Sequence, residues 1–173
     1  MTHEGKSPAK IAVLEALSRL VLTRRSPQPP VADLLREAGI ARSTFYEHFD
    51  GRDSALIEAL EGPLSLLADA ATGGADEARL SMLLDHFREN RRSAADLLSG
   101  PLAGRLRRRF SALIEQRLDR EGGDLALDLA NQQLAQIRLW LEGETRHSAA
   151  RLATIMVAGA AALRAAYAEL AKR

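Results

Sequence analysis

The stretch from residue 31 to residue 56 reads VADLLREAGIARSTFYEHFDGRDSAL. Its apolar residues recur at helical spacing in two short segments, residues 31–38 and residues 42–49. Gly39 ends the first segment, because glycine readily adopts the positive φ that the C-terminus of a helix often requires. Two short helices joined by a tight turn that contains glycine are the pattern of a helix-turn-helix.

The outer side of the second helix is polar. In a helix-turn-helix the first helix packs across the second, which presents hydrogen-bonding side chains to the major groove of DNA. Leu34, Leu35 and Phe45 can make the contact between the two helices. The side chains expected to point away from that contact are Arg42, Ser43, Thr44, Tyr46, Glu47 and His48. The segment therefore predicts a helix that reads DNA.

A longer helix is expected before this pair. Ser7 can cap its N-terminus and Pro8 can occupy its first position. Three prolines within residues 26–30 end it, since proline removes a backbone donor and restricts the residue before it. The three helices form one module, and the predicted domains are residues 1–52 and 53–173.

Beyond residue 53 the sequence predicts helices separated by glycine-rich breaks. The chain is 46% hydrophobic but only 4% aromatic, so that its apolar residues are mostly Ala and Leu. These residues favour helices, and too few Val, Ile and aromatic residues cluster to form a sheet. We expect an all-α protein of about nine helices, in which the three-helix module precedes a larger helical bundle.

Several classes of function are not expected. The chain has no cysteine, which excludes disulfides and cysteine-based zinc sites. Its histidines and carboxylates lack the spacing of metal ligands, and no catalytic or nucleotide-binding motif is present, so we expect neither a metal, a cofactor nor an enzymatic activity. No apolar stretch resembles a membrane span or a signal peptide, which predicts a cytoplasmic protein without a membrane segment.

The charge of the N-terminal module leaves alternatives open. Residues 1–60 carry eight basic and eight acidic residues, whereas nucleic-acid binders usually have a strongly basic face. A helical protein-interaction module with weak or no DNA binding is the second interpretation, and a helical enzyme or small-molecule carrier is the third. Salt dependence separates the first two, because contacts to phosphate make DNA affinity fall steeply with salt.

Residues 31–56 closely resemble the TetR family of transcriptional regulators. The run from Arg42 to Phe49, RSTFYEHF, is similar almost letter for letter to the recognition helix of that family. These 26 residues are about 15% of the 173-residue chain, and the resemblance is fainter beyond residue 60. It implies an N-terminal DNA-binding domain followed by a C-terminal domain for ligand binding and dimerisation.

The resemblance also implies a set of DNA-contacting residues: Arg42, Ser43, Thr44, Tyr46, His48 and Arg52. Thr44 and Tyr46 are expected to touch phosphates or base edges, and His48 a phosphate. Arg52 stands where the family usually has a phosphate-contacting lysine. Arg42 and Ser43 are the expected base readers, since arginine is the side chain that most often reads guanine.

Two features depart from the family pattern. Pro29-Pro30 replaces the Ser or Thr that usually opens the first short helix and meets a phosphate. Asp50 and Asp53 flank Arg52 and repel phosphate. Both departures predict a modest affinity for DNA.

The last two expected helices resemble those that join two TetR-family subunits in a four-helix bundle. Small residues there allow close approach of helix backbones; the alternative is packing within the monomer. The expected interface residues are Leu134, Ile137, Leu141, Ile155, Ala158, Gly159 and Ala162. Such a homodimer sets two recognition helices about one DNA turn apart, roughly 34 Å.

Members of the family commonly bind a small effector inside the C-terminal domain. The candidate wall residues of such a pocket are Leu66, Met82, Phe87, Phe110, Ile114, Gln133, Gln136 and Trp140. Residues of these types are more often plain core than the wall of a ligand pocket. Because none of these is charged and few are polar, an apolar effector is expected. The whole sequence thus predicts a homodimeric repressor that binds a palindromic operator and is released by a small apolar ligand.

Overall fold

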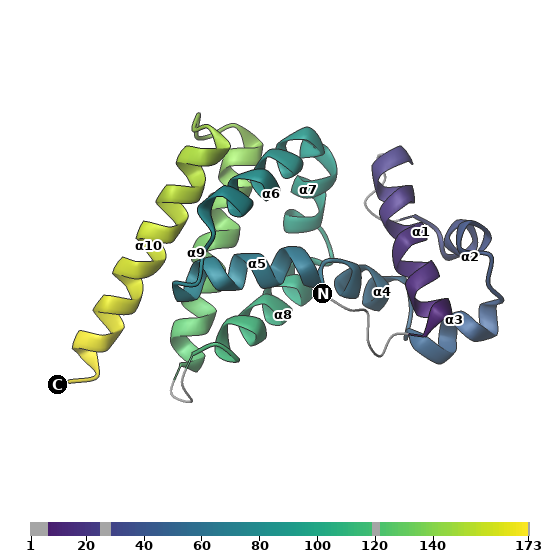
Figure 1. The fold of residues 1–173 in the computed structure, drawn as a ribbon, viewed down its shortest axis with the longest axis horizontal. Helices are drawn as coiled ribbons and strands as arrows, with labels where there is room; N and C mark the ends of the chain where they lie inside the picture. The colour runs from purple at the N-terminus through teal and green to yellow at the C-terminus, as the bar shows by residue number, and fades with distance from the viewer. Residues whose placement is uncertain (1–6, 25–28, 119–121, 173) are drawn as a thin grey trace. The chain divides into compact units, whose positions relative to one another are not determined.

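The computed structural model describes residues 7–24, 29–118 and 122–172. These residues form ten α-helices and no strand, which confirms the expected all-α fold (Figure 1). The chain divides into two compact units, Met1–Glu61 and Gly62–Arg173.

The first unit is built around its first helix. It contains α1 (Pro8–Arg24), α2 (Val31–Ala38), α3 (Arg42–His48) and α4 (Arg52–Ala59), and α1 packs against the other three. The buried apolar side chains of the unit are Val13, Ala16, Leu17, Leu20, Leu34, Phe45, Phe49, Ala55 and Leu56. One continuous core therefore holds all four helices.

The fourth helix completes this core. α4 buries Ala55 and Leu56, and Nζ of Lys10 on α1 lies 2.9 Å from a carboxylate oxygen of Glu58. Because α4 packs along α1, the compact unit extends beyond residue 52, where the sequence placed the domain boundary.

The turn between α2 and α3 follows the sequence closely. Gly39 has a φ of 67° and donates its backbone N–H to the carbonyl of Leu35, so it ends α2 in the left-handed conformation expected there. Pro30 precedes α2 without any side-chain cap. The start of α2 therefore lacks the hydroxyl cap of the family pattern, as Pro29-Pro30 predicts.

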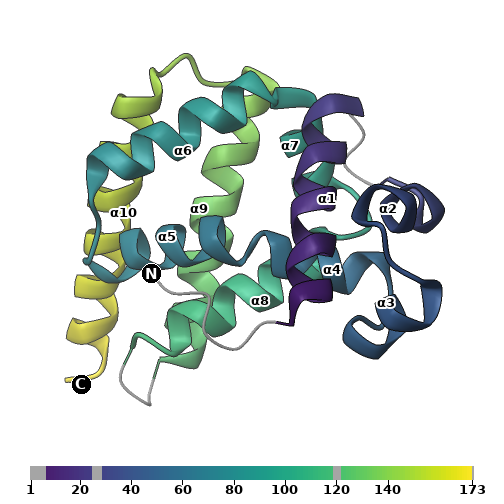
Figure 2. The same ribbon diagram turned by 45° about the vertical axis from the view of Figure 1, so that its right-hand side comes forward.

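The second unit consists of the remaining six helices. They are α5 (Glu61–Thr72), α6 (Glu77–Glu89), α7 (Arg91–Ser99), α8 (Ala103–Glu115), α9 (Gly123–Glu142) and α10 (Ala149–Leu170). α9 packs against α7, α8 and α10, while α10 also packs against α6 (Figures 1 and 2). The core of this unit therefore surrounds α9.

Two features of the helical pattern differ from the sequence expectation of about nine helices. α7 is a helix of its own, which begins directly after Asn90 ends α6. α4 and α5 are separated by Leu60, and Pro63 lies in the first turn of α5. Proline is tolerated there because a first-turn N–H has no partner within the helix.

α10 carries more apolar surface than the protomer buries. Within the described residues it is the one helix long and apolar enough to cross a membrane by length and composition, although only 28% of its most apolar window is buried. Leu152, Ala153, Met156 and Ala160 form its buried side. Much of its remaining alanine-rich surface is left open on the outside of the unit.

Candidate nucleic-acid interface

α3 is fixed to the first unit by two aromatic rings. Phe45 and Phe49 are buried, and their ring centroids lie 5.3 Å apart. The ring of Tyr46 meets that of Phe45 edge-on at 5.2 Å. Aromatic pairs in this geometry stabilise packing beyond the area they bury. The orientation of α3 is therefore set by its buried side.

The opposite side of α3 is open to solvent. Arg42 and Ser43 are exposed at the start of the helix, and Tyr46 is 49% exposed one turn later. Thr44 and His48 are half-buried at the flanks. The structure thus brings five of the six predicted DNA-contacting residues onto one short helix.

His48 has a partner that the sequence did not indicate. Its Nε2 lies 2.9 Å from Oγ of Ser7, 41 positions earlier in the chain. The same Oγ accepts the backbone N–H of Lys10 at 3.2 Å and so caps the start of α1. Only the capping role could be read from the sequence, because no local pattern relates Ser7 to His48.

Arg52, the sixth predicted residue, begins α4 and is turned towards its own neighbour. Its Nε and Nη2 lie 3.3 and 3.2 Å from Oδ1 of Asp53. The guanidinium that was expected to meet a DNA phosphate is therefore paired with the carboxylate of Asp53. The repulsion of phosphate by Asp50 and Asp53 stays a prediction.

Other cations of the first unit are paired in the same way. Arg19 lies 2.9 Å from Glu37, and Arg36 lies 2.5 Å from Asp33. These pairs are partly exposed, and such pairs are typically worth less than about 1 kcal/mol each. They can exchange their partners at little cost, but with eight basic and eight acidic residues in residues 1–60 the first unit has no excess of positive charge.

The residues predicted to bind an effector lie in several different environments. Phe110 and Ile114 of α8 are fully buried, while Leu66, Phe87 and Gln136 are half-buried. Met82 is 73% exposed on α6, so its assignment to the wall of an internal pocket is wrong. Helical spacing placed Met82 beside buried neighbours, but its side chain faces solvent.

Two of these residues already have polar partners within the protein. Gln133 is fully buried, and its amide, turned to satisfy both groups, donates to the carbonyl of Leu67 and accepts the N–H of Ala71, each at 3.2 Å. The indole N–H of Trp140 donates to the carbonyl of His147 at 2.8 Å. Both side chains therefore have a structural role that needs no ligand.

An open surface cavity of about 250 Å³ lies among α7, α8 and α9. Its lining residues are Leu98, Ala103, Gly104, Arg107, Asn131, Leu134, Ala135 and Arg138. None of the eight predicted effector-binding residues is among them.

The predicted dimer residues divide between the core and the surface. Ile137 and Leu141 are almost fully buried inside the protomer, so their assignment to an interface is wrong. Gly159 faces α9: a Cβ placed on it would lie 2.8 Å from Nε2 of Gln132, which shows close packing within the protomer. Its small size therefore serves the contact between α9 and α10.

The other predicted dimer residues remain accessible. Ala158 and Ala162 are exposed on α10, and Leu134 and Ile155 are half-buried. Two exposed leucines of α9, Leu127 and Leu139, were not predicted as interface residues. The structure alone identifies these two leucines as exposed, because α9 has apolar residues on more than one side.

No protein-family model matches the chain. One similar protein is the HTH-type transcriptional regulator EthR of Mycolicibacterium smegmatis, which is 37% identical over 81 residues. The match covers 47% of this chain and 36% of that protein, so the chain spans about a third of the length of the relative it matches. A match of this length extends beyond residues 31–56.

Proposed function

We propose that this chain is a transcriptional regulator of the TetR type that binds double-stranded DNA sequence-specifically through α3. Its similarity to EthR over 81 residues supports a role in the regulation of transcription. The observation that carries the proposal is the two-sidedness of α3. Phe45 and Phe49 hold it from within, while Arg42, Ser43 and Tyr46 are exposed on its outer side. A short helix anchored in this way can enter a major groove without distortion of its own unit.

The exposed side chains have distinct proposed roles. Arg42 can donate two parallel hydrogen bonds to a guanine, and Ser43 can meet a neighbouring base edge. Tyr46 and Thr44 are suited to a phosphate or a base edge. His48 and Arg52 are proposed to contact phosphates, which fixes the register of the protein on the duplex.

A homodimer is the proposed binding form. Leu127 and Leu139 of α9 are exposed, and the protomer leaves much of the alanine-rich side of α10 uncovered. A second copy related by a twofold axis can bury this surface, and its symmetry then requires a palindromic operator. We also propose that the protein is cytoplasmic and that α10 is an interface helix and not a membrane anchor.

Repression released by a small apolar effector is the proposed mode of control. Such control requires that effector and DNA favour different conformations of the protein. An apolar effector is proposed because most of the residues expected to line its pocket, among them Phe110, Ile114 and Phe87, are apolar. No enzymatic activity is proposed.

One observation favours a second candidate function. Lys10, Arg19, Arg36 and Arg52 each lie within an ion pair in the first unit. A protein-interaction module with weak or no DNA binding has no need of unpaired cations, whereas a DNA reader usually does.

Selection from random duplex DNA by the purified full chain tests the proposal. We expect enrichment of a palindrome at low salt, and loss of that enrichment in Arg42→Ala. Arg92→Ala, which removes an exposed arginine from the second unit, is the matched control and should retain it. If low salt gives no enriched sequence, the protein-interaction function replaces the proposal.

A further inference from the structure

We infer that Ser7 is a positioning residue for DNA binding, because its hydroxyl holds His48 in the form that can donate a hydrogen bond to a DNA phosphate. This inference rests on the proposed function and adds to it a residue outside the helix-turn-helix. Ser7 precedes α1, and His48 is the last residue of α3.

The hydrogen bond between the two side chains joins two elements far apart in sequence. Oγ of Ser7 lies 2.9 Å from Nε2 of His48 in a partly buried position. Nζ of Lys10 lies 5.7 Å from the centroid of the Phe49 ring and 2.9 Å from Glu58. The first turn of α1 is therefore tied to the end of α3 and to α4, so that Ser7 is a fixed point for the imidazole.

The hydrogen-bonding capacity of Ser7 determines what His48 can do. A serine hydroxyl has one proton to donate and two sites at which it accepts. One site accepts the backbone N–H of Lys10 at 3.2 Å. The hydroxyl can therefore donate its own proton to Nε2 of His48, or accept a proton from that nitrogen at its second site.

A phosphate selects between these two arrangements. Phosphate oxygens only accept hydrogen bonds, so a neutral imidazole can bind one only through an N–H. If Ser7 donates to Nε2, the ring proton is on Nδ1 and that nitrogen becomes the donor. In the opposite arrangement Nδ1 carries a lone pair and is repelled by the phosphate. Because the Ser7 hydroxyl can donate to Nε2, it favours the form of His48 that carries its proton on Nδ1 and can donate to a phosphate.

The main competing explanation is that Ser7 serves only as a helix cap. Glycine is an acceptable N-cap and is only slightly less stabilising than serine at that position. Ser7→Gly therefore removes the hydroxyl while it largely keeps the helix start. Ser148 supplies the matched control, because its Oγ caps α10 by accepting the N–H of Arg151 at 3.2 Å. Ser148→Gly removes the same kind of cap from the second unit.

The test is a double-mutant cycle on the affinity of the full chain for its selected operator. We expect Ser7→Gly to weaken binding by roughly threefold to tenfold, the usual effect of one lost hydrogen bond. In a His48→Ala background, Ser7→Gly should have no further effect, because Ser7 acts through His48. Ser7→Thr, which retains a hydroxyl, should bind like wild type, and so should Ser148→Gly.

A spectroscopic measurement gives an independent readout. Nitrogen NMR of the histidine rings in the DNA complex, assigned with His48→Ala, should show the proton of His48 on Nδ1 in wild type. Unchanged binding by Ser7→Gly, additive effects of the two substitutions, or a proton on Nε2 would each overturn the inference and leave the proposed function intact. Wild-type protein that binds no DNA would instead overturn the proposed function and this inference with it.

Discussion

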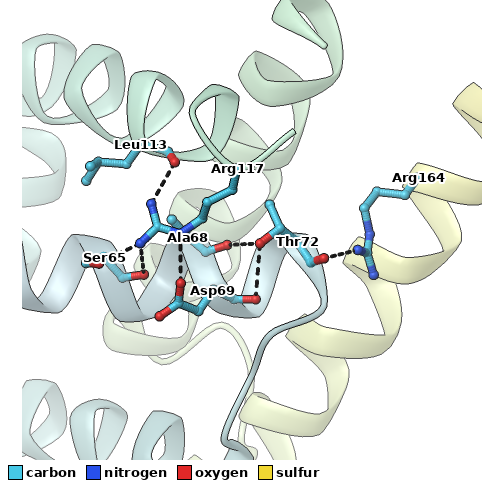
Figure 3. A network of polar contacts seen from close by, with 7 residues as sticks. All are labelled: Ser65, Ala68, Asp69, Thr72, Leu113, Arg117 and Arg164. Carbon is cyan, nitrogen blue, oxygen red and sulfur yellow. Dashed lines mark hydrogen bonds and ion pairs between the residues drawn. The ribbon is translucent and has the colours of Figure 1, made fainter. Parts of the chain in front are cut away.

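Nε of Arg117 donates to Oδ1 of Asp69 at 2.7 Å and so joins the turn after α8 to the middle of α5 (Figure 3). The same guanidinium donates to the carbonyl of Leu113 at 2.8 Å and to Oγ of Ser65 at 2.6 Å. At the end of α5, Arg164 of α10 donates to the carbonyl of Thr72. Two arginines, one from the turn after α8 and one from α10, therefore hold α5 in place.

Replacement of Arg117 should destabilise the second unit. The side chain is 25% exposed and its partner Asp69 is 42% exposed, so solvent screens part of the interaction. We expect Arg117→Ala to lower the free energy of unfolding by about 1–2 kcal/mol, since several charged hydrogen bonds are lost together. Urea denaturation measures this effect. Arg138→Ala breaks a more exposed pair with Glu142 and should cost less; equal costs would contradict the special role of Arg117.

Release of Arg52 from Asp53 should strengthen DNA binding. Asp53→Asn removes the carboxylate that pairs with Arg52 and also removes one charge that repels phosphate. We expect higher affinity at low salt and a plot of log affinity against log salt that is steeper by about one unit, because one more phosphate is neutralised. Asp85→Asn, which frees Arg88 in the second unit, is the control. An unchanged slope for Asp53→Asn would contradict the claim that the ion pair with Asp53 keeps Arg52 from a phosphate.

The exposed leucines of α9 should decide the oligomeric state. A charge introduced at Leu139, which is 37% exposed, would have to be buried in the proposed interface, and burial of an unpaired charge is costly. We expect Leu139→Arg to convert the homodimer into a monomer in sedimentation velocity. Met82→Arg places the same charge on a more exposed apolar residue of α6 and should leave the mass unchanged. A wild-type protein that sediments as a monomer would remove the dimer from the proposal.

The hydroxyl of Tyr167 should titrate later than an ordinary tyrosine. It donates to Oδ2 of Asp128 at 2.5 Å, and this hydrogen bond raises the pKa of Tyr167, with smaller contributions from desolvation and from the charges of Asp128 and Asp124. Asp128→Asn should lower this pKa, and Asp124→Asn should lower it less. Ultraviolet titration in a Tyr46→Phe background isolates Tyr167, since the chain has two tyrosines.

The sign of the associated stability effect follows from the raised pKa. The neutral hydroxyl is favoured in the folded state, so its contribution to stability is complete below the unfolded pKa of about 10. That contribution is lost as the pH rises through the folded pKa. A pKa for Tyr167 that does not respond to Asp128→Asn would contradict the assignment of its cause.

The sequence was sufficient for the parts of the fold that depend on local signals. The end of α2 follows from the backbone freedom of Gly39, and the inner side of α3 follows from two phenylalanines four residues apart. Each of these signals acts within one helix or one turn. They also determine which side chains of α3 remain exposed, and so most of the candidate site could be predicted.

Features that depend on tertiary contacts could not be predicted in this way. α9 has apolar residues on more than one side, so its spacing could not show that Ile137 and Leu141 face inward while Leu127 and Leu139 face outward. The partner of His48 is equally hidden, because Ser7 lies 41 positions away. Such contacts are set by the packing of α1 and α9 against helices distant in sequence.

The measurement that tests the central claim most directly is the affinity of the wild-type chain for its selected operator and for a scrambled duplex, determined by fluorescence anisotropy. We predict a clear preference for the operator and a steep fall of affinity with salt. The preference should be lost in Arg42→Ala with thermal stability unchanged, and in Tyr46→Ala with a small loss of stability, because the ring of Tyr46 packs against Phe45. Equal affinity for both duplexes, or an operator preference that survives both substitutions, would contradict the assignment of α3 as the reading helix.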